Sequence, residues 1–198
     1  MNIGRIARRL GYSAIGVLLL AGAAPTGAFA QHDHASQRHG SQADQKKRAG
    51  ALVKVVREAT ARFRDVSVAD AEGYELQFGC VSGSDVGAMG MHFVNGPLVG
   101  DGVLDPARPE IVIYEPTSNG RLRLIGADYL VFAEAWHKTH AGPPEMMGQL
   151  FHLFESPNRF GLPAFYTLHV WAWKDNPGGT FVNWHPNVSC DGFSGQNP

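Results

Sequence analysis

Short β-like segments recur along the chain after Tyr74, and the gaps between them constrain the fold most strongly. The segments are rich in β-branched and aromatic residues, whereas Gly, Pro, Asn and Asp mark the gaps. None of the gaps has the pattern of a crossover helix, which a parallel pair of strands would require. The sequence therefore predicts antiparallel strands over residues 74–81, 91–95, 110–115, 121–132 and 164–174.

Two local patterns sharpen this expectation. Residues 111–116 and 121–125 flank Asn119-Gly120, a pair that readily adopts positive φ in a tight turn, so a hairpin is predicted there. The gap 138–163 is long, irregular and rich in proline. Loops of this length usually cover or form a functional region.

The region before Tyr74 has a helical pattern. An apolar stripe at helical spacing begins after Arg48 and predicts a helix that packs by one face; its members are Leu52, Val55, Val56, Ala59 and Phe63. Ser67 and Asp70 suit the cap of a second short helix that ends near Gly73. The predicted fold is α+β: an N-terminal helical pair packed on an antiparallel sheet of five or six strands, in a single domain over residues 48–198.

Residues 1–30 have the three parts of a cleaved signal peptide. Arg5, Arg8 and Arg9 precede an uncharged apolar run over residues 14–24, and small residues stand at Ala28 and Ala30. The run is too short to span a bilayer, and no later stretch approaches the roughly 20 apolar residues that a span needs. The sequence predicts cleavage after Ala30 and export to the periplasm or the extracellular space.

The expected mature chain is mildly acidic and holds two cysteines. Without the three arginines of the signal it has 14 basic and 18 acidic residues, a net charge of −4. This charge disfavours nucleic acid as a partner, because phosphate binding needs a strongly basic patch. Cys80 and Cys190 are expected to form a disulfide bond in an oxidising compartment. The sequence does not predict an oligomeric state.

Residues 31–47 contain no large apolar side chain, so burial cannot offset the entropy of ordering them, and a disordered arm is expected. The arm carries His32, His34 and His39. Their imidazoles could converge on a copper, nickel or zinc ion, or they could belong to a polar linker with no site.

Common catalytic signatures are absent from the sequence, including nucleophile elbows, phosphate-binding loops and zinc-protease motifs. Three histidines instead lie among large apolar neighbours: His92, His152 and His169. By strand alternation, His169 shares a face with Phe165 and Thr167, a mixture of aromatic and polar groups typical of a pocket lining. Glu115 continues a buried strand face and is expected to have a partner or a perturbed pKa.

Three interpretations remain open. In the first, His92, His152 and His169 with Glu115 bind a transition metal ion, copper or zinc, and nearby methionines would favour copper. In the second, these side chains line an aromatic pocket of a small-molecule-binding protein or of a metal-free enzyme, with His169 and Glu115 as a proton-transfer pair. In the third, the histidines are structural residues of an envelope protein that has no active site.

Overall fold

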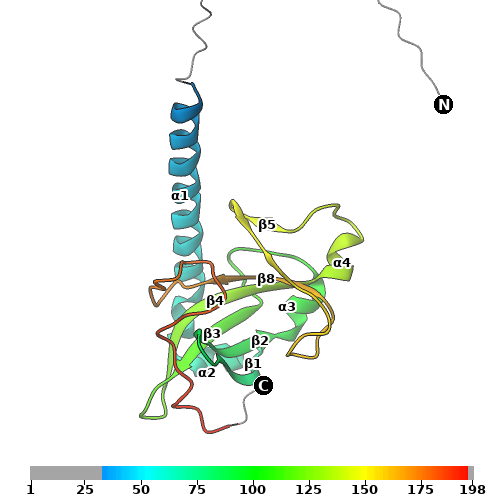
Figure 1. Cartoon of the computed structure of the whole chain (residues 1–198). Helices are drawn as coiled ribbons and strands as arrows, with labels where there is room; N and C mark the ends of the chain where they lie inside the picture. Colours follow the sequence, from blue (N-terminus) through cyan, green and yellow to red (C-terminus); the bar gives the residue numbers. More distant parts are fainter. Residues whose placement is uncertain (1–32, 196–198) are drawn as a thin grey trace, which may run out of the picture.

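The computed structural model describes residues 33–195, which form a mixed α+β fold (Figure 1). Six strands form one antiparallel sheet, which agrees with the predicted antiparallel sheet of five or six strands, and their order is β1-β2-β3-β4-β8-β7. The strands are β1 (Tyr74–Gly83), β2 (Gly87–Asn95), β3 (Ile111–Pro116), β4 (Leu122–Phe132), β7 (His152–Phe154) and β8 (Phe165–Val170). A separate hairpin joins β5 (Glu145–Met146) to β6 (Gln149–Leu150).

The described helices are α1 (Asp33–Thr60), α2 (Val66–Ala71), α3 (Gly96–Asp101) and α4 (Ala133–His137), with a 3-10 turn over Ala61–Arg64. None of them combines the length and the hydropathy that a membrane span requires. The predicted signal peptide lies outside the described residues. The N-cap of α2 is Asp65, two residues before the predicted cap Ser67, because the Asp65 side chain accepts a hydrogen bond from the backbone N–H of Ser67.

Helix α1 begins at Asp33 and therefore runs through most of the segment 31–47 that composition predicts to be disordered. Its first half extends beyond the sheet (Figure 1), and residues 41–48 are exposed. Buried contacts begin at Leu52 and continue at Val56, where the predicted apolar stripe reaches the sheet. The division of the chain into arm and domain stays a prediction.

The two faces of the sheet have different roles. One face packs against α1 through alternate residues of β4 and β8, among them Tyr129, Val131 and Leu168. The side chains between them, such as Asp128, Leu130 and Thr167, point to the other face. The hairpin between β3 and β4 turns at Gly120, whose φ is +76°, as Asn119-Gly120 predicts.

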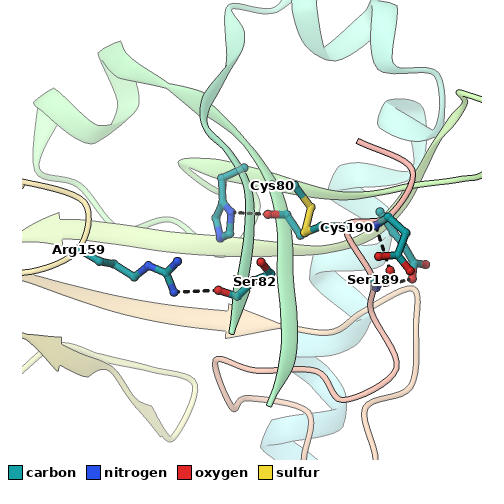
Figure 2. The surroundings of a disulfide bond; sticks show 9 residues. Cys80, Ser82, Arg159, Ser189 and Cys190 are labelled. Carbon is teal, nitrogen blue, oxygen red and sulfur yellow. Dashed lines mark hydrogen bonds between the residues drawn. A yellow bond between two sulfur atoms is a disulfide. The ribbon is translucent and has the colours of Figure 1, made fainter. Parts of the chain in front are cut away.

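A disulfide bond joins Cys80 in β1 to Cys190 near the C-terminus, which confirms the predicted pair (Figure 2). The bond closes a loop of 110 residues. In the chain-entropy model, a loop of this length lowers the free energy of the folded state relative to the unfolded state by about 4–5 kcal/mol. The disulfide therefore fixes the irregular C-terminal segment to the sheet.

Candidate functional site

The face of the sheet opposite α1 holds a pocket of about 380 Å³. Its wall is mostly apolar and includes five phenylalanines, namely Phe78, Phe132, Phe154, Phe160 and Phe165. The predicted pocket face of β8 is part of this wall, because Phe165, Thr167 and His169 all line it. Exposed lining residues, such as Glu75 and Gln77, mark the mouth, and buried polar residues mark the bottom.

Four polar residues gather at the bottom of the pocket: His92, Asp128, Thr167 and His169, each at most 7% exposed. His92 comes from β2 and His169 from β8, and two strands lie between them. In a flat sheet, three strand spacings would separate their backbones by about 14 Å. The Nε2 atoms of the two imidazoles are nevertheless 3.3 Å apart, because the sheet is curled and both side chains point into its hollow.

Asp128 lies directly opposite His169 in the pairing of β4 with β8. Its Oδ1 accepts a hydrogen bond from the hydroxyl of Thr167 (2.5 Å) and lies 3.5 Å from Nδ1 of His169. His92, Asp128 and His169, called here the His–Asp–His group, each offer one ligand atom, and these atoms lie within 4.8 Å of one another. The group therefore has the composition and the spacing of a metal site that could hold one ion.

Burial favours the uncharged form of each residue of the His–Asp–His group; at pH 7 it keeps both imidazoles neutral but leaves most of Asp128 ionised. Removal from water lowers the pKa of His92 to about 4 and that of His169 to about 3, so both imidazoles are neutral at pH 7. Burial also raises the pKa of Asp128 to about 6, although the nearby His92 and the Thr167 hydroxyl oppose this shift. Neutral imidazoles are the form that binds metal ions.

The hydrogen bonds restrict the imidazole tautomers. Nδ1 of His92 faces the carbonyl oxygen of Gly90 at 3.3 Å and must donate to it, so Nε2 carries the lone pair. If His169 donates from Nε2 to that lone pair, its own Nδ1 presents a lone pair to the Asp128 carboxylate. Among the described residues this buried Nδ1 makes no well-formed hydrogen bond. A cation between the two Nε2 atoms would let Nδ1 carry the proton and donate it to Asp128.

Residues 154–162, called here the cap, cover part of the pocket with the side chains of Phe154, Phe160 and Leu162. Asn158 organises the cap: its amide donates to the carbonyls of Glu155 and Leu162, and its Oδ1 accepts from the N–H groups of Phe160 and Leu162. Arg159 donates to the carbonyl oxygen of Ser82 (3.0 Å), which joins the cap to β1 (Figure 2). The end of the long segment 138–163 thus has the covering position expected of it.

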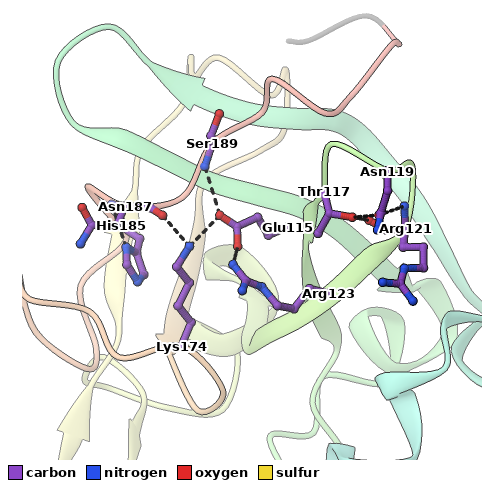
Figure 3. Close-up of polar contacts among 9 residues, drawn as sticks. All are labelled: Glu115, Thr117, Asn119, Arg121, Arg123, Lys174, His185, Asn187 and Ser189. Atoms are coloured by element: carbon purple, nitrogen blue, oxygen red, sulfur yellow. Dashed lines mark hydrogen bonds and ion pairs between the residues drawn. The ribbon is translucent and has the colours of Figure 1, made fainter.

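Two of the four residues proposed from the sequence as metal ligands do not lie in this group. His152 is exposed, and its Nε2 donates to the carbonyl oxygen of Phe181 (3.3 Å). Glu115 is buried at another end of the sheet, where it forms ion pairs with Lys174 (2.6 Å) and Arg123 (Figure 3). Burial opposes the ionisation of Glu115, but these two cations outweigh it and hold its pKa below the usual value.

The sequence pattern places Thr167 on the predicted pocket face but gives Asp128 no role in the site. A signal for Asp128 exists, since it is the one acid inside the otherwise apolar stretch 124–132. Of the methionines considered as copper ligands, Met89 lines the pocket, whereas Met91, Met146 and Met147 belong to or pack on other apolar clusters. The arm histidines stay a hypothesis, because His32 lies outside the described residues and His34 and His39 lie in the first turns of α1.

Comparison with known proteins provides no template for this site, so its chemistry follows from its geometry alone. The chain matches no protein-family profile, no curated protein sequence and no solved structure.

Proposed function

We propose that the protein binds one transition metal ion in its pocket through Nε2 of His92 and Nε2 of His169, with Asp128 balancing the charge of the ion. The distance of 3.3 Å between the two Nε2 atoms carries this proposal. Ligands about 2.0–2.1 Å from a tetrahedral ion lie about 3.3–3.4 Å from each other. The carboxylate of Asp128 is close enough to act on the ion or on His169.

The unsatisfied Nδ1 of His169 supports a metal site over a purely structural histidine pair. Buried polar groups in native proteins nearly always have a partner, and an unsatisfied one needs an explanation. Metal binding supplies one, because it moves the proton of His169 to the nitrogen that faces Asp128. Two imidazoles and a carboxylate suit zinc, copper or iron. We propose zinc or copper, and Met89 in the pocket wall is compatible with copper.

The metal site would be of the open type. Protein ligands approach the ion from the sheet, and the opposite side faces the cavity, which leaves coordination positions for water or a small molecule. Structural zinc sites are usually closed by four protein ligands, whereas catalytic sites keep an open position. A bound ion would supply Lewis acidity there. The protein residues would position the ion, exclude bulk water with the cap and hold a proton at Asp128.

A second candidate function is metal-free proton transfer between Asp128 and His169 on a small molecule in the pocket. The observation that favours it is the position of Asp128, whose Oδ1 accepts a hydrogen bond from the Thr167 hydroxyl and lies 3.5 Å from Nδ1 of His169. In this scheme Asp128 is the proton-transfer partner of His169, the role that the sequence predicts for Glu115. Ligand binding or activity that persists after chelation would favour it over the metal site.

We also propose that the protein is exported after cleavage at Ala30. The disulfide bond between Cys80 and Cys190 supports export, because such bonds persist in oxidising compartments. Amino-terminal sequencing of the protein from its native host would test the cleavage site. A start at Gln31 is expected, and a retained Met1 in a cytoplasmic fraction would contradict the proposal.

Metal titration of the full chain tests the main proposal. After dialysis against a chelator, the wild-type protein should bind about one equivalent of Zn²⁺ or Cu²⁺, and Co²⁺ should give visible d–d absorption. H92A and H169A should lose this equivalent, while H152A and a triple variant with alanine at His32, His34 and His39 should keep it. Far-UV circular dichroism checks that each variant is folded, and H169N provides a variant of closer shape. Binding that survives in folded H92A and H169N but fails in the triple variant would overturn the proposal.

A further inference from the structure

The pocket beside the His–Asp–His group is larger than a metal ion and its water need. A cavity of about 150 Å³ can hold one benzene ring, and small-molecule sites usually measure about 300–1,000 Å³. At about 380 Å³, this pocket has room for a substituted ring or two fused rings. We propose that it binds a neutral aromatic molecule with a hydroxyl group, a phenol, whose oxygen faces His92 and His169. This inference rests on the proposed function, since the oxygen would occupy the open position of the ion.

The aromatic rings of the pocket wall favour a flat apolar ligand. Phe154 and Phe165 are parallel to within 2°, with ring centroids 5.1 Å apart. Phe160 is inclined by about 60° to both of them. Aromatic rings gain energy from offset-stacked and edge-to-face contacts, and this set of rings offers both faces and edges to a bound ring.

The bottom of the pocket favours a hydrogen-bond donor on the ligand. Without a cation, the donors at the bottom are already used, because Nε2 of His169 donates to Nε2 of His92. The Thr167 hydroxyl likewise donates to Asp128, and the Asp128 carboxylate is then the acceptor for a ligand. A phenolic O–H can donate a hydrogen bond to an acceptor at the bottom of the pocket, whereas an ether or ketone oxygen would face these acceptors with no proton to donate. With the ion bound, the same oxygen can replace water as a ligand.

The charges of the lining disfavour an anionic ligand. The ionisable lining residues are two acids and two histidines, namely Glu75, Asp128, His92 and His169, and the lining contains neither lysine nor arginine. In the metal-free protein, a carboxylate or phosphate would lose its hydration on entry and meet Asp128 and Glu75 without a cation to balance it. A neutral ligand avoids this cost.

Isothermal titration with a matched set of ligands tests the class. The set is p-cresol, toluene, 4-methylanisole and p-toluate, each added to metal-loaded and to chelated protein. We expect p-cresol to bind at least 10-fold more tightly than toluene and 4-methylanisole to the loaded protein, and at least 10-fold more tightly than p-toluate to the chelated protein. Equal binding of 4-methylanisole to the loaded protein, or of p-toluate to the chelated protein, would overturn the inference.

Two variants locate the binding. Leu162 lines the pocket from the cap, so L162W should fill the cavity and weaken p-cresol binding at least 10-fold without changing metal affinity. Leu153 is 46% exposed and does not line the pocket, so L153W is the matched control and should bind like wild type. Unchanged p-cresol binding in folded L162W would place the ligand elsewhere and overturn the inference.

The same experiment separates the two proposals. Metal binding without preference for p-cresol would refute the ligand class and leave the metal site standing. If no metal binds but p-cresol still binds selectively to chelated protein and L162W abolishes this binding, the metal site is wrong and the pocket's preference for phenols holds. If the protein binds neither metal nor p-cresol, both proposals are refuted.

Discussion

Glu115 and Asp128 are both buried acids on neighbouring strands of one sheet, but their charges are balanced in different ways. Glu115 has two cationic partners, Lys174 and Arg123, and also lies 3.4 Å from the backbone N–H of Ser189. These four residues are called here the Glu115 cluster. Asp128 has a hydroxyl and an imidazole as partners and, within residues 33–195, forms no ion pair with lysine or arginine.

This difference separates a structural charge from a candidate functional one. The Glu115 cluster is electrostatically complete, and it holds the C-terminal segment against the sheet (Figure 3). The His–Asp–His group is incomplete, because its carboxylate and its lone pairs face each other in a cavity. A cation would complete it. For these two acids, the missing counter-charge distinguishes the candidate site, whereas burial alone does not.

Removal of the disulfide should have the largest effect on stability. This effect should concern the region of the Glu115 cluster and not the His–Asp–His group. Replacing both Cys80 and Cys190 by alanine should lower the free energy of unfolding by about 4–5 kcal/mol, because the unfolded chain gains the freedom of a 110-residue loop. Urea unfolding measures this loss. Metal affinity, measured well below the melting temperature, should stay within about twofold, and a parallel fall would show that the two regions are not independent.

The acids themselves should differ in their effect on metal binding. D128N should lower the affinity for Zn²⁺ by about 10–100-fold, which corresponds to about 1.4–2.7 kcal/mol, because the ion and His169 lose a carboxylate. E115Q is the matched change in the Glu115 cluster and should leave the affinity unchanged. Competition with a chromophoric chelator measures both constants. Equal losses of Zn²⁺ affinity in D128N and E115Q would contradict the distinction between the two acids.

Loss of a cation from the Glu115 cluster should cost stability in proportion to its burial. The Lys174 side chain is 20% exposed and that of Arg123 is 59% exposed. K174M should therefore destabilise the protein by about 2 kcal/mol, below the range for a fully buried pair, and R123M by less than about 1 kcal/mol. Denaturant midpoints at pH 7 measure both. A larger loss for R123M would show that the exposed pair is the stronger one.

The last comparison concerns pH and adds a third buried acid, Glu110, which accepts a hydrogen bond from the backbone N–H of Leu130. Burial raises its pKa to about 8. A raised pKa means that its contribution to stability is full below pH 4.5 and is lost as the pH rises through about 8. E110Q should therefore flatten the decline in stability between about pH 5 and 8.

Glu115 should show the opposite sign. Its pKa is lowered in the folded state, so its contribution is present above about pH 4.5 and is lost as the pH falls through the folded value. E115Q should flatten the acid limb of the stability curve and leave the alkaline limb unchanged. Unfolding curves recorded from pH 3 to 9 for both variants check the two signs, and a shared sign would contradict the assignment of partners.

Much of the fold follows from local patterns, whereas the site depends on contacts between distant residues. Alternation and turn residues predict the long strands and the hairpin at Gly120, but β7 is missed because three residues are too short for a periodic signal. Alternation also identifies the His169 face. It cannot show that Lys174 reaches Glu115 from 59 residues away, so from the sequence alone Glu115 looks like a site residue although its charge is already balanced.

The bulge in β1 supplies one ring of the pocket wall and is a site where the pocket can change in evolution. Gln77 pairs with His92, but Cys80 pairs with Met91, so Phe78 and Gly79 are two extra residues and Phe78 turns into the wall with a φ of +63°. Because the insertion has an even length, the residues on both sides keep their faces. Loss of this dipeptide would remove one ring from the wall without shifting a strand, which makes it a place where ligand preference can evolve by insertion or deletion.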